Sequence, residues 1–179
     1  MNQKKKYPGS MRALHWIMAI LIFGQIYVGW YMTPWKDTNL INELYVWHKS
    51  FGLLIFLLVV LRLLNRWRSD PPELPESIPS LDRTLAHWAH RLIYVFIVLI
   101  PITGYILSST YKYSSGVTFF GIDIPELLPK NDTAFAIFDR MHAILAYTML
   151  AVLTLHVAGV IKHRFFDKNP ENDVLKRML

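Results

Sequence analysis

The sequence predicts an all-α protein that crosses a membrane as a four-helix bundle, with both termini on the cytoplasmic side. Hydrophobic residues make up 53% of the 179 residues and charged residues only 18%, with a mean hydropathy of +0.27. This composition is too apolar for an ordinary soluble domain. Four apolar runs are also long enough to cross a hydrocarbon core of about 30 Å, which takes roughly 20 helical residues. We therefore expect a single membrane domain over residues 1–179.

The four spans are expected at about residues 11–33, 40–64, 85–109 and 136–161. The first ends in the aromatic stretch WYMTPW, which is typical of a membrane interface. It lacks the small-residue cleavage pattern of a signal peptide, so we expect it to be retained as a helix. The segment RSDPPELPESIPSLDR is expected to join the second and third spans as a stiff surface loop. The loop between the third and fourth spans contains SSGVTFFGIDIPELLP, whose apolar residues are expected to cap the outer end of the bundle.

The distribution of positive charge predicts the orientation of the spans. If the N-terminus is cytoplasmic, the inner flanks hold all but a few of the 19 Lys and Arg residues. The outer flanks then hold only Lys36, Lys49, Lys112, Lys130 and Arg140. Because cytoplasmic flanks carry an excess of Lys and Arg, this asymmetry favours a four-pass protein with both ends inside.

The apolar helices retain histidines, whereas the chain has no cysteine. The lack of cysteine excludes disulfides, iron–sulfur clusters, thiolate zinc sites and covalent haem attachment through a CxxCH motif. Histidine is therefore the main soft metal ligand available. Ionisable groups inside a membrane are costly and usually functional, which makes the intramembrane histidines candidate ligands.

The fourth span carries His142 and His156, which are fourteen residues apart. In an α-helix this spacing covers about 21 Å and falls about 40° short of four turns, so both rings point to nearly the same face. By depth, His48 in the second span matches His142 near the outer side. His15 in the first span similarly matches His156 near the inner side. The sequence therefore predicts an outer pair and an inner pair of imidazoles.

The third span offers two competitors for the inner pair, His87 and His90 in the stretch AHWAHR. Counting about 20 residues back from the outer end of that span places both at or beyond the membrane interface. The same count leaves His15 just inside the hydrocarbon. Depth thus prefers His15 only slightly, and replacement of His15 by His87 or His90 stays open.

Haem b is the group that fits between facing imidazoles of a membrane bundle. Two axial histidines saturate the iron and suit low-spin electron transfer, and facing helices supply them readily. Glycine and alanine positions such as Gly29, Gly52 and Ala146 leave room for a flat macrocycle, although small residues also occur wherever membrane helices pack closely. The sequence therefore predicts two haem b sites, with His15, His48, His142 and His156 as axial ligands.

The same motifs carry a resemblance that covers nearly the whole chain. ALHW, WHKSFG followed by RLLNRW, LAHWAHRLIYVFIVLIPITGY and MHAILAYTMLAVLTLHVAGVIKHRFFDKN occur in this order. The set resembles the prokaryotic cytochrome b561 family, which is similar to the cytochrome b subunits of membrane-bound nickel–iron hydrogenases. The resemblance implies two b-type haems on His15, His48, His142 and His156 in a multi-pass protein of the bacterial inner membrane. It also implies quinone-linked electron transfer, and superoxide oxidation coupled to ubiquinone reduction is known within the family.

Several polar residues are candidates for contacts around these sites. Arg12, Arg62 and Arg91 are candidate partners of inner haem propionates, and snorkelling to the headgroups is the competing interpretation for Arg62. Lys49 and Arg140 are next to the outer ligand pair and, with Lys112 and Lys130, are candidates for a cationic funnel for superoxide. Acidic residues share that surface: Asp123, Glu126, Asp132 and Asp139. Trp16, His87 and His90 are candidate quinone contacts, with Arg91 beside them.

The favoured function is electron transfer between an outer donor, which can be superoxide or an unidentified redox protein, and the ubiquinone pool. This is the chemistry of a superoxide:ubiquinone oxidoreductase. A second hypothesis is an electron-relay subunit of a partner dehydrogenase or hydrogenase, which the short inner loops disfavour. A third is a histidine-based metal or proton transporter, but no Asp or Glu lies deep in any span. The expected partners are the lipid bilayer, a quinone and a small redox donor, with no nucleic acid.

Overall fold

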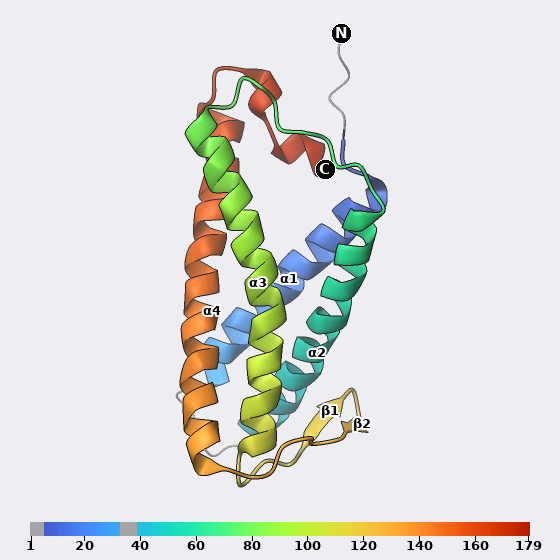
Figure 1. Ribbon diagram of the computed structural model, residues 1–179, viewed down its shortest axis with the longest axis vertical. Helices are drawn as coiled ribbons and strands as arrows, with labels where there is room; N and C mark the ends of the chain where they lie inside the picture. Colours follow the sequence, from blue (N-terminus) through green and yellow to red (C-terminus); the bar gives the residue numbers. More distant parts are fainter. Residues whose placement is uncertain (1–5, 33–38) are drawn as a thin grey trace.

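The computed structural model describes residues 6–32 and 39–179, and it confirms the four-helix membrane architecture. The helices are α1 (Gly9–Met32), α2 (Asn39–Trp67), α3 (Ser80–Thr110) and α4 (Asp132–Ile161). All four are long and apolar enough to cross a membrane. They run side by side in an elongated bundle, with the start of α1 and the C-terminal residues at the same end (Figure 1). We call this the inner end and the opposite end the outer end.

The observed helices extend beyond the predicted spans at several ends. α3 begins at Ser80 instead of residue 85, and α4 begins at Asp132 instead of residue 136. The prediction counted only the residues needed to cross hydrocarbon, whereas a helix continues into the polar interface as long as its ends are capped. The side chain of Asn131 supplies such a cap for α4, because its oxygen accepts a hydrogen bond from the Ala134 amide at 2.8 Å. The predicted end of the first span at residue 33, and Lys36, lie outside the described residues.

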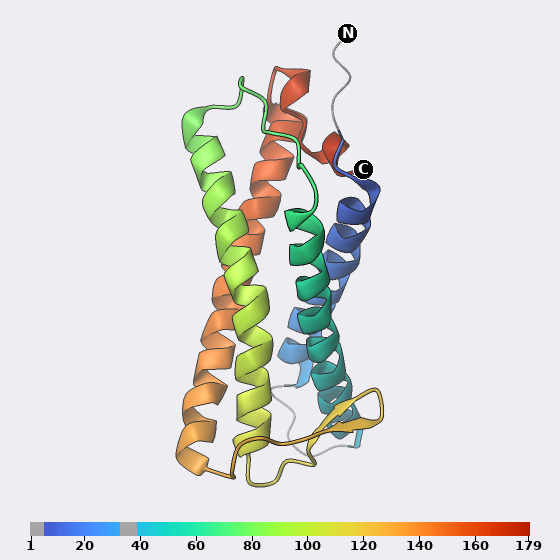
Figure 2. The same ribbon diagram turned by 45° about the vertical axis from the view of Figure 1, so that its right-hand side comes forward.

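The helices pack in sequence order, α1 on α2, α2 on α3 and α3 on α4 (Figure 2). Two apolar residues from each helix form the core: Met18, Ile22, Ile55, Val59, Phe96, Ile97, Met149 and Leu153. This core lies midway along the bundle. Most of the remaining apolar side chains on the helices face outward, such as Ile20 at 72% and Leu155 at 70% exposed. An apolar exterior of this kind is the surface that a lipid bilayer covers.

A short hairpin follows α3 at the outer end, where the sequence predicted only an apolar cap. β1 (Val117–Phe119) pairs antiparallel with β2 (Ile122–Ile124). Phe120 and Gly121 form the turn with φ angles of 48° and 89°, the left-handed conformation that two-residue hairpins use and that glycine adopts without strain. The hairpin packs on α2, where Ser50 Oγ donates to the Thr118 carbonyl at 2.9 Å. It therefore covers α2 close to His48.

The residues after α4 form a strap across the inner end. We define the C-terminal strap as residues 167–179, which follow a π-helical turn over Lys162–Phe166. Ser77 Oγ donates to Asn172 Oδ1 at 2.5 Å, and Arg177 donates to the Glu73 carbonyl at 2.7 Å. The indole N–H of Trp16 donates to the Met178 carbonyl at 2.9 Å. The strap thus joins the end of α4 to the inner loop and to the start of α1.

The carboxylate of Asp167 makes the stability of the strap dependent on pH. Hydrogen bonds from the Asn169 amide, the Asn172 side chain and His163 lower the pKa of Asp167 to about 2, from 3.8. A lowered pKa means that the carboxylate stabilises the folded strap fully above about pH 4, and that this contribution is lost as the pH falls through 2. In detergent, we expect pepsin cleavage within the strap to increase between pH 4 and pH 2, relative to cleavage in the outer loop. Asp167→Asn should make the strap cleavable across this range, and a strap equally resistant in both proteins would contradict the assignment.

Candidate functional site

The structure brings the four predicted ligand histidines together in two pairs. The ring centroids of His48 and His142 are 6.3 Å apart, and those of His15 and His156 are 6.4 Å apart. An imidazole nitrogen lies about 2 Å from a transition metal that it ligates, so two rings on opposite sides of one ion have centroids about 6 Å apart. Both pairs therefore have the separation that a shared metal ion requires.

The ring of His142 is already oriented for coordination through its far nitrogen. His142 Nδ1 lies 3.1 Å from the Ile100 carbonyl oxygen and 3.2 Å from Thr103 Oγ1. Since a carbonyl only accepts, Nδ1 carries the proton and donates it, which leaves the lone pair of Nε2 for a metal. α3 can approach this ring because residue 104 is glycine. A Cβ atom at Gly104 would lie 3.1 Å from His142 Cε1.

His48, the partner of His142, is positioned by a hydrogen bond to its backbone carbonyl. Gln25 Nε2 on α1 donates to the His48 carbonyl at 2.7 Å, and a Cβ atom at Gly52 would lie 3.6 Å from that Gln25 nitrogen. Within the described chain, His48 Nδ1 is buried and has no hydrogen-bond partner. A buried polar nitrogen without a partner is costly in a folded protein. This unsatisfied nitrogen, next to His142, is consistent with a ligand-binding ring.

The inner pair has more polar neighbours than the outer pair. Arg62 on α2 reaches His15, with 3.1 Å between its NH2 nitrogen and His15 Nδ1, and its Nε donates to Tyr94 Oη at 3.1 Å. The ring of His90 lies 5.1 Å from that of His156, measured between centroids. This is about 1 Å too close for two rings on opposite sides of one metal ion. The His15–His156 distance fits that arrangement better.

A regular spacing in the sequence, beyond the predicted histidines, places these neighbours. Each helix carries two site residues fourteen positions apart: His15 and Gly29, His48 and Arg62, His90 and Gly104, His142 and His156. One member of each couple lies at the outer level, where Gly29 faces His48 and Gly104 faces His142. The other member of each couple lies at the inner level, and these members are His15, Arg62, His90 and His156. The fourteen-residue spacing of the α4 histidines also identifies Gly104, which was not among the predicted site residues.

The apolar core separates the two levels. Each core residue of α1, α2 and α4 lies between the two site residues of its helix, such as Met18 between His15 and Gly29. Met149 and Leu153 likewise lie between His142 and His156, which are about 21 Å apart along α4. Apolar side chains therefore separate the outer and the inner histidine pair.

The residues predicted to contact a quinone have different neighbours at the inner end. Trp16 packs edge-on against His15, with centroids 5.3 Å apart, and also binds the strap. His90 lies against His156, and both His87 and His90 are exposed towards the inner end of α3. Arg91, a predicted propionate partner, stacks on Trp88 at 5.2 Å from the ring centroid. Arg12 donates to the backbone oxygen of Leu179. Of Arg12, Arg62 and Arg91, only Arg62 directly contacts a predicted ligand histidine among the described interactions.

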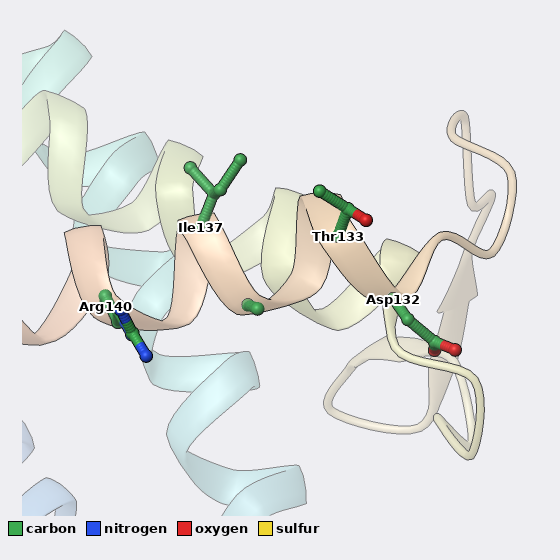
Figure 3. A pocket seen from close by; sticks show the side chains of 5 residues that line it. Asp132, Thr133, Ile137 and Arg140 are labelled. Atoms are coloured by element: carbon green, nitrogen blue, oxygen red, sulfur yellow. The ribbon is translucent and has the colours of Figure 1, made fainter.

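The predicted outer cations are spread over the outer surface. Lys49 Nζ donates to the Gly116 carbonyl at 2.9 Å, and Lys130 pairs with Glu126 at 2.6 Å. Lys112 stacks on Tyr113. Arg140 lines a shallow hollow of about 410 Å³ on the first turns of α4 with Asp132, Thr133, Ala136 and Ile137 (Figure 3). Acidic side chains therefore neutralise part of the charge that the funnel hypothesis assumed.

Comparison with known proteins adds an independent line of support. A family model described as prokaryotic cytochrome b561 matches residues 6–179. The chain is 29% identical over 180 residues to cytochrome b561 homolog 2 of Escherichia coli K12, covering 99% of this chain and 93% of that protein. It is 25% identical over 178 residues to a probable superoxide oxidase CybB of Yersinia pestis, covering 97% and 96%. With its four membrane-type helices and paired histidines, the chain belongs to the prokaryotic cytochrome b561 family.

Proposed function

We propose that each histidine pair holds one haem b and that the protein carries single electrons across the bacterial inner membrane to or from ubiquinone. Membership of the family already implies a haem b protein of membrane electron transfer. The centroid distances of 6.3 and 6.4 Å carry the assignment of two haems to His48–His142 and His15–His156. His90 remains the competing inner ligand, with the less suitable distance of 5.1 Å.

The protein's own groups have defined tasks in this proposal. Haem b held by two imidazoles supplies a low-spin iron that accepts and releases one electron with little rearrangement. The Ile100 carbonyl fixes the His142 ring and makes that ligand more basic. The core around Met149 and Phe96 excludes water between the sites. Because the two sites lie at opposite levels, an electron crosses the membrane without movement of a protein element.

We further propose superoxide as the outer donor. A relative that is 25% identical is named a probable superoxide oxidase. Lys49 and Arg140 place positive charge near the outer pair, which attracts a small anion. The inner end, with Trp16, His87 and His90, is the proposed region of ubiquinone contact.

The experiment is to purify the chain alone in detergent and measure its pigment and its reaction. We expect about two haem b per protein by pyridine haemochrome assay, and reduction of these haems by xanthine oxidase-generated superoxide. Superoxide dismutase should abolish the reduction, and added ubiquinone should reoxidise the haems. A colourless protein would overturn the haem proposal. A red protein that dithionite reduces but superoxide does not would overturn the donor, and activity that appears only with a partner dehydrogenase would favour a relay subunit.

A further inference from the structure

The two levels of the bundle differ in what faces the ligand histidines. At the outer level, the positions of the fourteen-residue couples that face the ligand histidines are glycines, with Gly29 against His48 and Gly104 against His142. The corresponding positions at the inner level hold polar side chains, Arg62 against His15 and His90 against His156. The ligand pairs themselves are alike in separation. The levels therefore differ chiefly in the residues around the ligands, and one of these residues is a cation.

The guanidinium of Arg62 is fixed in place beside the inner pair. Its Nε donates to Tyr94 Oη at 3.1 Å, and its Cζ lies 5.6 Å from the centroid of the Tyr94 ring. The side chain is partly buried. In the described part of the chain, no carboxylate oxygen lies within 4.0 Å of Arg62 to neutralise its charge. A positive charge without a counter-ion in a membrane span is costly, which indicates a function for it.

The hydrogen bond to His15 constrains what Arg62 does when metal binds. A guanidinium has only donors, so His15 Nδ1 accepts in this contact and the ring proton of a neutral His15 lies on Nε2. Coordination through Nε2 requires that nitrogen to be free of its proton. For a neutral ring the proton must then be on Nδ1, which ends the hydrogen bond from Arg62. Tyr94 still binds Nε, so the charge stays at the inner level while one guanidinium nitrogen becomes available to another acceptor.

We propose that Arg62 raises the reduction potential of the haem at the inner pair above that at the outer pair, and so directs electrons from the outer level to the inner level. This inference rests on the proposed function. Reduction of ferric to ferrous iron removes one positive charge, so a fixed cation nearby in a low-dielectric medium favours the reduced state. Such a transfer would oxidise the outer site by one electron and reduce the inner site by one electron, and it would require no proton. The outer counterpart, Lys49, donates to a loop carbonyl instead of a ligand histidine.

The test is a redox titration of each haem separately. His48→Ala leaves the inner haem for measurement, and His15→Ala leaves the outer haem. In the His48→Ala background, we expect Arg62→Met to shift the equilibrium between reduced and oxidised inner haem about tenfold or more towards the oxidised form. This corresponds to a fall in the reduction potential of about 59 mV for a one-electron couple. Arg62→Lys should retain most of the wild-type potential because it keeps the charge. Arg68→Met is the control, since Arg68 is exposed just beyond the end of α2, and it should change the potential much less.

Each outcome decides the proposal. An inner potential that Arg62→Met leaves unchanged, or an inner haem of lower potential than the outer haem in the wild type, would overturn it. If Arg62→Met fails to bind the inner haem, Tyr94→Phe replaces it. This variant keeps every charge but releases Nε, so the inner potential should fall by a smaller amount, and an unchanged potential would overturn the role of Arg62. Absence of haem from the wild-type protein would instead refute the proposed function.

Discussion

Replacing His48 or His15 with alanine is expected to remove about one of two haems per protein, as measured by pyridine haemochrome assay. Each substitution deletes one of two axial ligands, and the remaining imidazole, His142 or His156, cannot hold a six-coordinate low-spin iron alone. The core lies between the two levels, so the site that is not mutated should keep its haem. Full haem content in either variant would refute that residue as a ligand.

His90→Ala is the matched control for the inner pair. The ring of His90 lies closer to His156 than the ring of His15 does, 5.1 Å against 6.4 Å between centroids, yet only the longer distance suits a shared iron. We therefore expect His90→Ala to retain both haems. Loss of the inner haem from His90→Ala, together with its retention in His15→Ala, would transfer the ligand role to His90.

Adding one methyl group at Gly104 is expected to weaken haem binding at the outer pair on the order of tenfold, the effect typical of a change beside a metal ligand. A Cβ atom there would lie 3.1 Å from Cε1 and 3.3 Å from Nδ1 of His142, closer than the 3.5–4.0 Å of a favourable carbon contact. The ring has little freedom to move, because its Nδ1 is hydrogen-bonded to Ile100 of the same helix as Gly104. We expect Gly104→Ala to lower the outer haem content at limiting haem and leave the inner haem unchanged.

Gly29→Ala provides the comparison for this prediction. It makes the same chemical change at the same level, against the other ligand of the pair, but its Cβ would lie 3.6 Å from His48 Cε1. That distance is ordinary van der Waals contact, so Gly29→Ala should bind haem like the wild type. Equal haem affinity in the two variants would show that the approach of Gly104 does not control the His142 ring.

The lengths of the apolar runs predicted the spans, and helical spacing together with depth along each span predicted the histidine pairs. A run of about 20 apolar residues identifies a membrane helix, and a fourteen-residue spacing places two side chains on nearly one face. Helix ends were less predictable, because α3 and α4 continue beyond the hydrocarbon into segments that composition alone does not mark. The hairpin at Phe120–Gly121 was also missed, since strands of three residues carry almost no pattern.

Contacts between helices could not be predicted in the same way. The approach of Gly104 to His142 depends on how α3 rotates against α4, and the strap contact between Trp16 and Met178 joins residues at opposite ends of the chain. Neither follows from the residues nearby in sequence. Arg62 was predicted as a propionate partner from its depth, but its contact with His15 required the packing of α1 on α2. Depth is a one-dimensional property, whereas the neighbours of a ligand depend on three dimensions.

The order in which the helices pack has a consequence for the biogenesis of the protein. α1 packs along α2 and α3 along α4, while each proposed ligand pair takes one histidine from the first two helices and one from α4. Neither site is complete until the ribosome has delivered the last transmembrane segment. Haem insertion is then the last step of assembly, and it joins the first two helices, α1 and α2, to α4. In cells starved of iron, the polypeptide should accordingly accumulate without haem and be degraded by the quality-control proteases of the membrane.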